Sequence, residues 1–237
     1  MASLLENALF YLKCFFYQGN ININNMQGTG FAWLVRPLLR KRGIELTRKE
    51  TADLRGYFNT NPSFITLVLG IFLKALTQQR DTAFSVRNSY ASACAGLGDS
   101  FFWHGLRPFL FILAFFLYVH VSEYGALIYP LVYTIFHLAF ILVGRRIGEA
   151  LGGRTVEIFN RFKLKQWADF TDKISVILVG MILVNFIKYG EQGTVYWLPI
   201  AFLVFILGFA AHKCLRPILF LLTIITFILI SGYLIGT

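Results

Sequence analysis

The stretch "GLGDSFFWHGLRP", from Gly96 to Pro108, sets a group of polar side chains directly in front of an apolar run. That run, Phe109 to Ser122, carries no Lys, Arg, Asp or Glu and is rich in aromatic side chains. Charged groups inside a membrane are costly, so Asp99 and Arg107 at the head of such a run need partners. The stretch predicts a helix at membrane depth with polar chemistry at its beginning.

The polar residues of this stretch have two interpretations. In the first, Asp99 caps a helix that begins near Ser100, and the long side chain of Arg107 extends to the membrane surface. In the second, they form a polar site, because a helix N-terminus at membrane depth can shape a binding site. Asp99 and Arg107 are eight residues apart. One helix would separate them by about 12 Å, so we expect each to find another partner.

The overall composition indicates an integral membrane protein. Of the 237 residues, 57% are hydrophobic and only 14% are charged, whereas soluble domains carry about 25% charged residues. The mean hydropathy is +0.62. We therefore predict an all-α integral membrane protein with several transmembrane helices, and with re-entrant or amphipathic segments in its N-terminal half.

The net charge of +10 arises largely from two groups of basic residues, at 36–55 and 145–173. Basic loops between membrane spans follow the positive-inside rule without any nucleic acid. We therefore place both groups on the cytoplasmic side or at the lipid headgroups. Their expected partner is membrane lipid, and no nucleic-acid partner is expected.

Charge-free apolar runs predict the membrane helices, each of which needs about 20 residues to span the bilayer. The candidates are Phe109–Ser122, Tyr124–Gly144, the shorter Ile174–Ile187, Gln192–His212 and Pro217–Thr237. We expect one domain with a polar and re-entrant core half at 1–107, membrane segments at 108–144, a cytoplasmic or interfacial segment at 145–173 and C-terminal membrane helices at 174–237.

The N-terminal half contains a shorter apolar segment, Pro62 to Leu76, which carries Lys74. Irregular backbone at membrane depth is tolerated only where it is buried in protein or lines a cavity. Interrupted apolar segments are also a sequence pointer to a transporter's binding site. We therefore expect re-entrant structure in this half of the chain.

Amide and hydroxyl side chains gather in two further places. They are the cluster of Gln18, Asn24, Asn25 and Gln27, and the stretch "FNTNP" with Asn59, Thr60 and Asn61 before Pro62. Amide side chains both donate and accept hydrogen bonds, and aromatic rings can cover the apolar face of a sugar. With Asp99 and Trp103 these residues suit a sugar site. The alternative for "FNTNP" is a simple turn, because Asn, Thr and Pro favour turns.

The sequence contains no catalytic or metal-binding motif. Cys14, Cys94 and Cys214 form no CxxC pair, and the histidines form no HExxH. Ser100 is not in a GxSxG frame, and no GxxxxGK phosphate loop occurs. We therefore expect no enzyme site of its own, no metal and no other cofactor.

Three motifs resemble those of one membrane-protein family. "FNTNP" is similar to the family's F-N-T-x-P, and Gly96–Pro108 is similar to G-[IVL]-G-D-[SP]-x-F-W-G-[TG]-[LV]-R-P. Gln18-Gly19 and "MQGTGF" at Met26–Phe31 are similar to Q-G followed by M-Q-x-x-G-F. The family is the IID subunit of the mannose/fructose/sorbose-type phosphotransferase systems, and the resemblance covers nearly the whole chain.

The resemblance implies a transport function shared with other subunits. IID pairs with a membrane subunit, IIC, and the two form a trimer of heterodimers in the bacterial cytoplasmic (inner) membrane. The cytoplasmic phosphocarriers IIA and IIB relay phosphate from phosphoenolpyruvate to the incoming mannose-type hexose. IID has no phosphorylation site of its own, so the resemblance implies a transport subunit and not an enzyme.

The resemblance also assigns the polar residues to the sugar pathway. The expected substrate-binding residues are Gln18, Gln27, Asn59, Thr60, Asp99, Ser100, Phe102 and Trp103. The residues expected to shape helix ends are Pro62, Gly96, Gly98 and Arg107. Asp99 and the amides would bond sugar hydroxyls, and Phe102 or Trp103 would support the sugar ring.

Several positions depart from the family pattern. Trp103-His104-Gly105 replaces Trp-Gly-Thr, and Thr77-Gln78 replaces a Glu-Glu pair. Because these changes touch the expected pathway, the alternative is a receptor, regulatory or vestigial membrane protein that keeps the IID fold without active transport.

Overall fold

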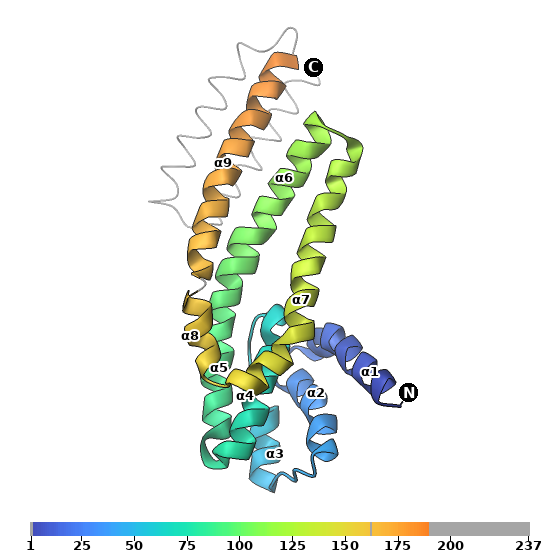
Figure 1. Ribbon diagram of the computed structural model, residues 1–237, viewed down its shortest axis with the longest axis vertical. Helices are drawn as coiled ribbons and strands as arrows, with labels where there is room; N and C mark the ends of the chain where they lie inside the picture. The colour runs from blue at the N-terminus through green and yellow to red at the C-terminus, as the bar shows by residue number, and fades with distance from the viewer. Residues whose placement is uncertain (1, 162, 190–237) are drawn as a thin grey trace. The chain divides into compact units, whose positions relative to one another are not determined.

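The structure, a computed structural model, describes residues 2–161 and 163–189, which are largely helical (Figure 1). The predicted spans at 192–212 and 217–237 lie outside the described residues. The chain divides into two compact units, Met1–Val179 and Gly180–Thr237, and the account below concerns the first. The α-helices are α1 (Ala2–Phe16), α2 (Gly28–Lys41), α3 (Arg48–Arg55), α4 (Ile65–Gln78), α5 (Ala83–Gly98), α6 (Arg107–His120), α7 (Ile128–Leu151), α8 (Arg154–Arg161) and α9 (Leu164–Tyr189). The other helical segments are the 3-10 turns η1 (Tyr17–Asn20), η2 (Pro62–Phe64), η3 (Arg80–Thr82) and η5 (Glu123–Leu127), and the π-helical segment η4 (Asp99–Leu106).

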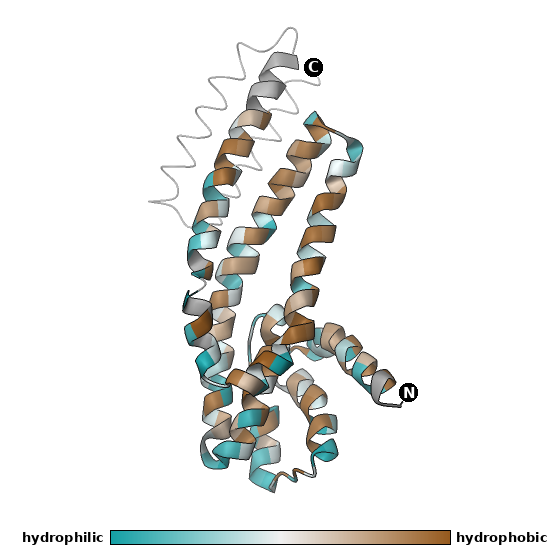
Figure 2. Cartoon of the chain, in the orientation of Figure 1, coloured by the Kyte–Doolittle hydropathy of each residue, from teal (hydrophilic) through white to brown (hydrophobic). Residues whose placement is uncertain are grey.

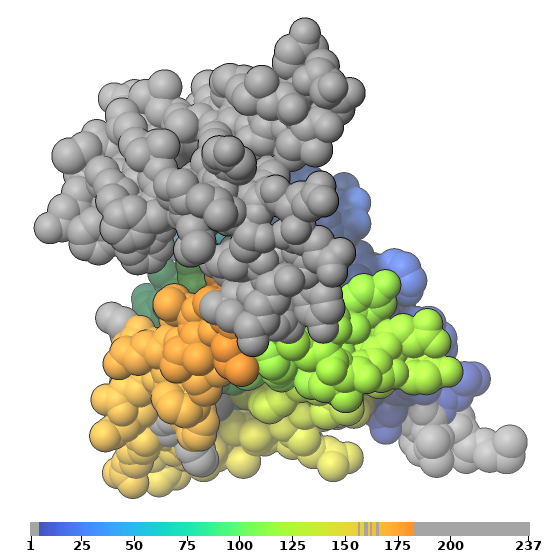
Figure 3. Space-filling model, turned by 90° about the horizontal axis from the view of Figure 1, so that it is seen from above, coloured from blue at the N-terminus to red at the C-terminus, as the bar shows by residue number. Residues whose placement is uncertain are grey.

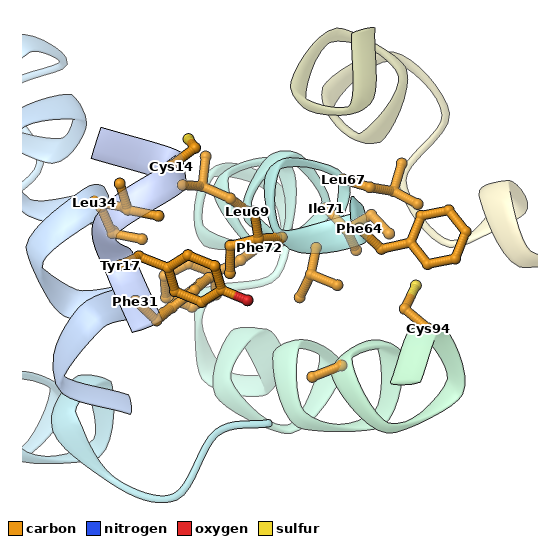
Figure 4. Packing of buried hydrophobic residues seen from close by; sticks show 14 of the residues in the cluster. Cys14, Tyr17, Phe31, Leu34, Phe64, Leu67, Leu69, Ile71, Phe72 and Cys94 are labelled. Carbon is orange, nitrogen blue, oxygen red and sulfur yellow. The ribbon is translucent and has the colours of Figure 1, made fainter. Parts of the chain in front are cut away.

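Helix α4 is the centre of the core of the first unit. Each of its residues from Ile65 to Leu73 is buried. A helix that is apolar on all sides is stable in a protein only where other elements cover it. Figure 4 shows Leu69 and Phe72 of α4 close to Tyr17 and Phe31, which belong to η1 and α2. The short apolar segment of the N-terminal half is therefore a helix enclosed by the rest of the unit.

Glycines allow α4 and α7 to cross with their backbones in contact. A Cβ atom added to Gly70 of α4 would overlap the carbonyl of Arg145, and one added to Gly148 of α7 would overlap the carbonyl of Leu67. Gly144 stands four residues before Gly148, which makes a G-x-x-x-G pattern. Small residues at this spacing let two helices approach closely. The crossing fixes the position of α7 on the core.

Gly148→Ala is expected to destabilise the unit by about 1–3 kcal/mol, because the added methyl group has no space between the two backbones. The matched control is Gly96→Ala in α5, where an added Cβ would meet no atom within 4 Å. That change should be neutral or stabilising by up to about 1 kcal/mol, since alanine favours the helix. Thermal unfolding in detergent measures both, and equal effects would contradict the crossing.

Two continuous helical stretches of the described chain, Arg80–His120 and Glu123–Leu151, are long and apolar enough to cross a membrane. Only 28% and 6% of their most apolar windows are buried, so they differ from the enclosed core helices of soluble proteins. Phe111 and Ile135 are 64% and 63% exposed. Apolar residues run along α6 and α7 in Figure 2, and the tip of this hairpin lies at the surface in green in Figure 3. Such exposed apolar surface suits contact with lipid.

Asp99 does not cap a helix, which corrects the first interpretation of the sequence. The backbone stays helical from α5 through η4 into α6, and Asp99 itself has φ −64° and ψ −43°. Ser100 therefore does not begin a helix whose N–H groups Asp99 could cap. Pro108 gives a physical reason for the wide π-helical turns. It has no N–H, and its ring would collide with the carbonyl four residues earlier in a regular α-helix.

A capping box begins α3, and an ion pair joins α3 to the start of the long helical stretch. The Glu50 amide donates to Thr47 Oγ1 at 3.2 Å, and the Thr47 amide donates to Glu50 Oε2 at 2.8 Å. Arg80 donates to both carboxylate oxygens of Glu50, at 2.8 and 2.9 Å. The bonds from Arg80, followed by the one from the Thr47 backbone, lower the pKa of the Glu50 carboxyl from 4.5 to about 2.

Glu50→Gln is expected to lower stability at neutral pH by up to about 1 kcal/mol. Glutamine can still accept the hydrogen bond from the Thr47 amide, so the loss is that of the ion pair with Arg80, which water screens. The pKa of Glu50 is lower in the folded than in the unfolded chain. Its carboxylate therefore stabilises the fold above the ordinary pKa, and this contribution is lost as the pH falls toward about 2. The difference in melting temperature between variant and parent should follow that course. A difference that does not change with pH would contradict the assignment.

Candidate functional site

The side chain of Gln27 holds the "FNTNP" loop in place. Its Nε2 donates to the carbonyl of Thr60 at 2.9 Å, and its Oε1 accepts from the amide of Thr60 at 3.0 Å. The amide of Gln27 also donates to the carbonyl of Phe58 at 2.9 Å. Gln27 and Thr60 are 3% and 2% exposed. The amide side chain thus pairs with the loop as a neighbouring strand would, and it joins two of the sequence motifs.

Asn61 joins the same loop to the long helical stretch. Its Oδ1 accepts from the amide of Ser63 at 3.1 Å, which caps η2, and its Nδ2 donates to Asp99 Oδ1 at 3.1 Å. Gly98 makes this approach possible, because a Cβ there would overlap the side chain of Asn61. The loop therefore lies directly against the carboxylate of the π-helical segment.

A further bond ties the loop to α7. The hydroxyl of Ser63 lies 2.8 Å from Nδ1 of His137, and the imidazole ring stacks on Tyr133 with a centroid distance of 6.3 Å. We call Thr60, Asn61, Ser63, Asp99 and His137 the polar cluster. It brings together side chains from the loop, from the π-helical segment and from α7.

The hydroxyl of Thr60 is buried and has no hydrogen-bond partner among the described residues. A buried polar group without a partner costs about 1–3 kcal/mol, so natural structures usually satisfy it with a protein group, water or a ligand. Asp99 accepts through Oδ1, and no bond from a described residue reaches its Oδ2. The cluster therefore contains one buried hydroxyl and one carboxylate oxygen that have no hydrogen-bond partner among the described residues.

The remaining predicted site residues lie in different surroundings. Ser100 is partly exposed beside Asp99, and Gln18 is partly buried in η1. Trp103 is 51% exposed, whereas Phe102 is fully buried and packs edge-on against the rings of Phe64 and Phe140. Trp103 is therefore the aromatic ring of this pair with a free surface.

The residues expected at helix ends lie in two different parts of the structure. Pro62 begins η2, directly after the capping residue Asn61. Gly96, Gly98 and Arg107 lie inside the continuous stretch Arg80–His120, and Arg107 Nε donates to the hydroxyl of Tyr129 at 3.2 Å. Asp99 and Arg107 thus have different partners, as their spacing predicts.

Asn59 lies apart from the polar cluster, in a groove of about 700 Å³ between the C-terminal end of α3 and α5. Arg87 also lines this groove and is only 2% exposed. Its guanidinium donates to the carbonyls of Asp53 and Leu54 at 3.1 and 3.3 Å. It also lies 5.5–6.0 Å from the ring centres of Phe31, Phe58, Phe72 and Phe84. Arg87 therefore joins α5 to the C-terminal end of α3 beside this groove.

The sequence interpretation missed Arg87 and His137. It named Asn61 in the "FNTNP" stretch but did not include it among the expected substrate-binding residues. Asn61 precedes a proline that opens a helical turn, which is a capping signal. Arg87 is the one cation in the small and polar run "SVRNSYASACAG", Ser85–Gly96. No local signal marks His137 as a partner of Ser63.

The fold and the site define a helical membrane protein with a polar cluster packed beside two apolar helices. The model of the PTS system mannose/fructose/sorbose family IID component matches residues 6–197. The chain belongs to this family, as the motifs indicate.

The mannose-specific EIID components of Escherichia coli strains K12 and O157:H7 are each 29% identical to the chain over 153 residues. The match covers 60% of this chain and 52% of each relative, so the chain spans about half the length of the curated relatives it matches.

Two solved structures share the fold. One, described as "Structure of membrane protein", has a TM-score of 0.71 at 21% identity and covers 97% of this chain and 96% of that chain. The other holds the mannose transporter ManYZ with microcin E492, and has a TM-score of 0.50 at 19% identity over 86% of this chain and 94% of that chain. The predicted all-α membrane fold is confirmed.

Thr60→Val is expected to raise the free energy of unfolding by about 1 kcal/mol, because it removes a buried hydroxyl that has no partner in the protein. The matched control is Thr66→Val, which removes a hydroxyl that donates to the carbonyl of Ile141 at 2.9 Å. Its free energy of unfolding should fall by about 1 kcal/mol. Thermal unfolding without sugar compares the two. If both variants are destabilised alike, Thr60 has a protein or water partner and the pointer to a ligand is wrong.

Proposed function

We propose that this chain and a IIC membrane subunit together form the path by which a mannose-type hexose crosses the bacterial cytoplasmic membrane. In this proposal IIA and IIB phosphorylate the sugar as it arrives inside, and no residue of this chain is catalytic. The observation that supports it best is the polar cluster, in which a carboxylate and an unpaired hydroxyl lie beside apolar membrane helices. The mannose-specific relatives support the sugar class.

The chemistry of the cluster suits a sugar, whose hydroxyls both donate and accept hydrogen bonds. Asp99 would accept through Oδ2, and the hydroxyl of Thr60 would pair with a sugar hydroxyl. Trp103 has the exposed ring that could cover the apolar face of a pyranose. Asn59 and Ser100 would extend the path on either side of the cluster.

Gln18, Gln27 and Phe102 take supporting roles in this proposal. Gln27 holds the backbone of Thr60, and Phe102 packs under the π-helical segment that carries Asp99 and Trp103. Gln18, in η1, would lie at the entrance to the path. The IIC subunit would supply the opposite wall, and a trimer of IIC–IID heterodimers is the expected assembly.

Asp99→Asn is expected to weaken sugar binding to the co-purified IIC–IID complex by about tenfold or more, since a hydrogen bond to a charged group contributes about 1.5–3 kcal/mol. Calorimetric titration with mannose, fructose, sorbose and N-acetylgalactosamine would measure the loss and identify the sugar. Asn59→Ala should weaken binding less, because Asn59 lies outside the polar cluster.

The matched control is Asp81→Asn, the same chemical change at an exposed position at the start of the same helical stretch. It should leave both sugar binding and assembly with IIC unchanged. Normal binding by Asp99→Asn, or equal losses in the two variants, would refute the proposed site.

A second candidate function is that of a receptor that keeps the IID fold without moving sugar. The observation that favours it is the similar structure in which ManYZ holds microcin E492, together with the changes at Trp103-His104-Gly105. A stable IIC–IID complex that binds none of the four sugars would support this alternative.

A further inference from the structure

A second polar site lies on another face of the first unit, between α1, α2 and the polar end of α7. It is a pocket of about 790 Å³. We call it the basic pocket, after the cations on its rim, Lys13, Lys41, Arg42 and Arg145. Its apolar wall consists of Leu9, Phe10, Leu34, Pro37 and Leu38. Cations above an apolar wall suit a ligand with an anionic head and a hydrocarbon body.

The pocket keeps positive charge after its ion pairs are counted. Lys41 pairs with Glu6 at 2.7 Å, and Arg42 and Arg145 share the carboxylate of Glu149 at 2.8 and 3.2 Å. Lys13 forms no ion pair with a described residue and lies 5.1 Å from the ring centre of Trp33. Four cations therefore face two carboxylates, which leaves a net positive charge at the pocket.

The sequence of α7 sets the depth of the pocket relative to a membrane. Arg145 and Arg146 directly follow the charge-free run at 124–144, and such a boundary lies at the level of the headgroups. The hydroxyl of Tyr11 in α1 donates to the carbonyl of Leu142 at 3.0 Å, so α1 is attached at this same level. In Figure 1, α1 extends sideways from the C-terminal part of α7.

The outer face of α1 carries an apolar stripe at helical spacing. Leu5, Leu9, Leu12 and Phe16 are 65%, 46%, 54% and 65% exposed. The opposite face of α1 packs inward through Phe10 and Cys14, which are 8% and 2% exposed. A helix that lies across the foot of a span and exposes leucine and phenylalanine suits the boundary between headgroups and acyl chains.

We propose that the basic pocket binds the phosphate headgroup of an anionic phospholipid, whose acyl chains lie along the apolar stripe of α1. Basic pockets between helices on the cytoplasmic side are suited to anionic headgroups. A free phosphate ion would use the cations but not the apolar wall or the stripe. The proposal rests on the pocket and on the apolar stripe of α1, and it does not depend on sugar transport.

The test is native mass spectrometry of the full-length chain, delipidated in detergent and titrated with dioleoylphosphatidylglycerol or dioleoylphosphatidylcholine. The parent should prefer the anionic lipid by about tenfold or more, and Lys13→Gln/Lys41→Gln should lose about fivefold in affinity for each cation removed. The matched control, Arg48→Gln/Lys49→Gln, removes two exposed cations of α3 outside the pocket and should bind like the parent.

Lys13→Arg/Lys41→Arg keeps the charge and should bind anionic lipid normally, which separates a lost site from a misfolded chain. Equal binding of the two lipids would overturn the proposal, as would equal losses in the pocket variant and the α3 control. Competition by inorganic phosphate as strong as by the lipid would assign the pocket to a free anion. If co-purified IIC, and not lipid, protects the thiol of a Leu9→Cys variant from labelling, the stripe belongs to that subunit and the proposal is also overturned.

Discussion

The contact between α4 and α7 is the constraint on which the rest of the first unit depends. Gly70, Gly144 and Gly148 let the two backbones touch, and the Thr66 hydroxyl adds a bond to the carbonyl of Ile141 at the same crossing. Small residues at a crossing let two helix backbones approach closely and pack tightly. Because α4 is enclosed by the core, its contact with α7 fixes the position of α7 relative to that core.

The geometry of the polar cluster follows from this crossing. His137 stands seven residues before Gly144 on the same helix, so the crossing also sets the position of its imidazole against Ser63. From the other side, the unbroken helical stretch through η4 brings Asp99 to Asn61. Gln27 fixes the loop between them. Three separate parts of the chain therefore hold the cluster before any ligand arrives.

The same helix connects the polar cluster with the basic pocket. Arg145 lines the pocket, and His137 stands eight residues earlier on α7, which is about 12 Å along a helix. Charged residues gather toward the foot of α7 and apolar ones toward its tip, as Figure 2 shows. One helix, α7, therefore carries both the residue at the membrane boundary, Arg145, and the cluster residue His137. Lipid bound near Arg145 would stabilise the helix that positions the cluster.

The sequence by itself determined the membrane class, the family and the two apolar helices, because hydropathy and motif spacing are local properties of the sequence. It also brought Asp99 and Thr60 into one expected site. Only the tertiary structure decided that Asp99 continues a helix instead of capping one, that Phe102 is buried while Trp103 is exposed, and that Asn61 reaches Asp99. Asn61 and Asp99 are 38 residues apart. Their contact depends on how closely Gly98 lets the loop approach, and that is a property of packing, which no local pattern encodes.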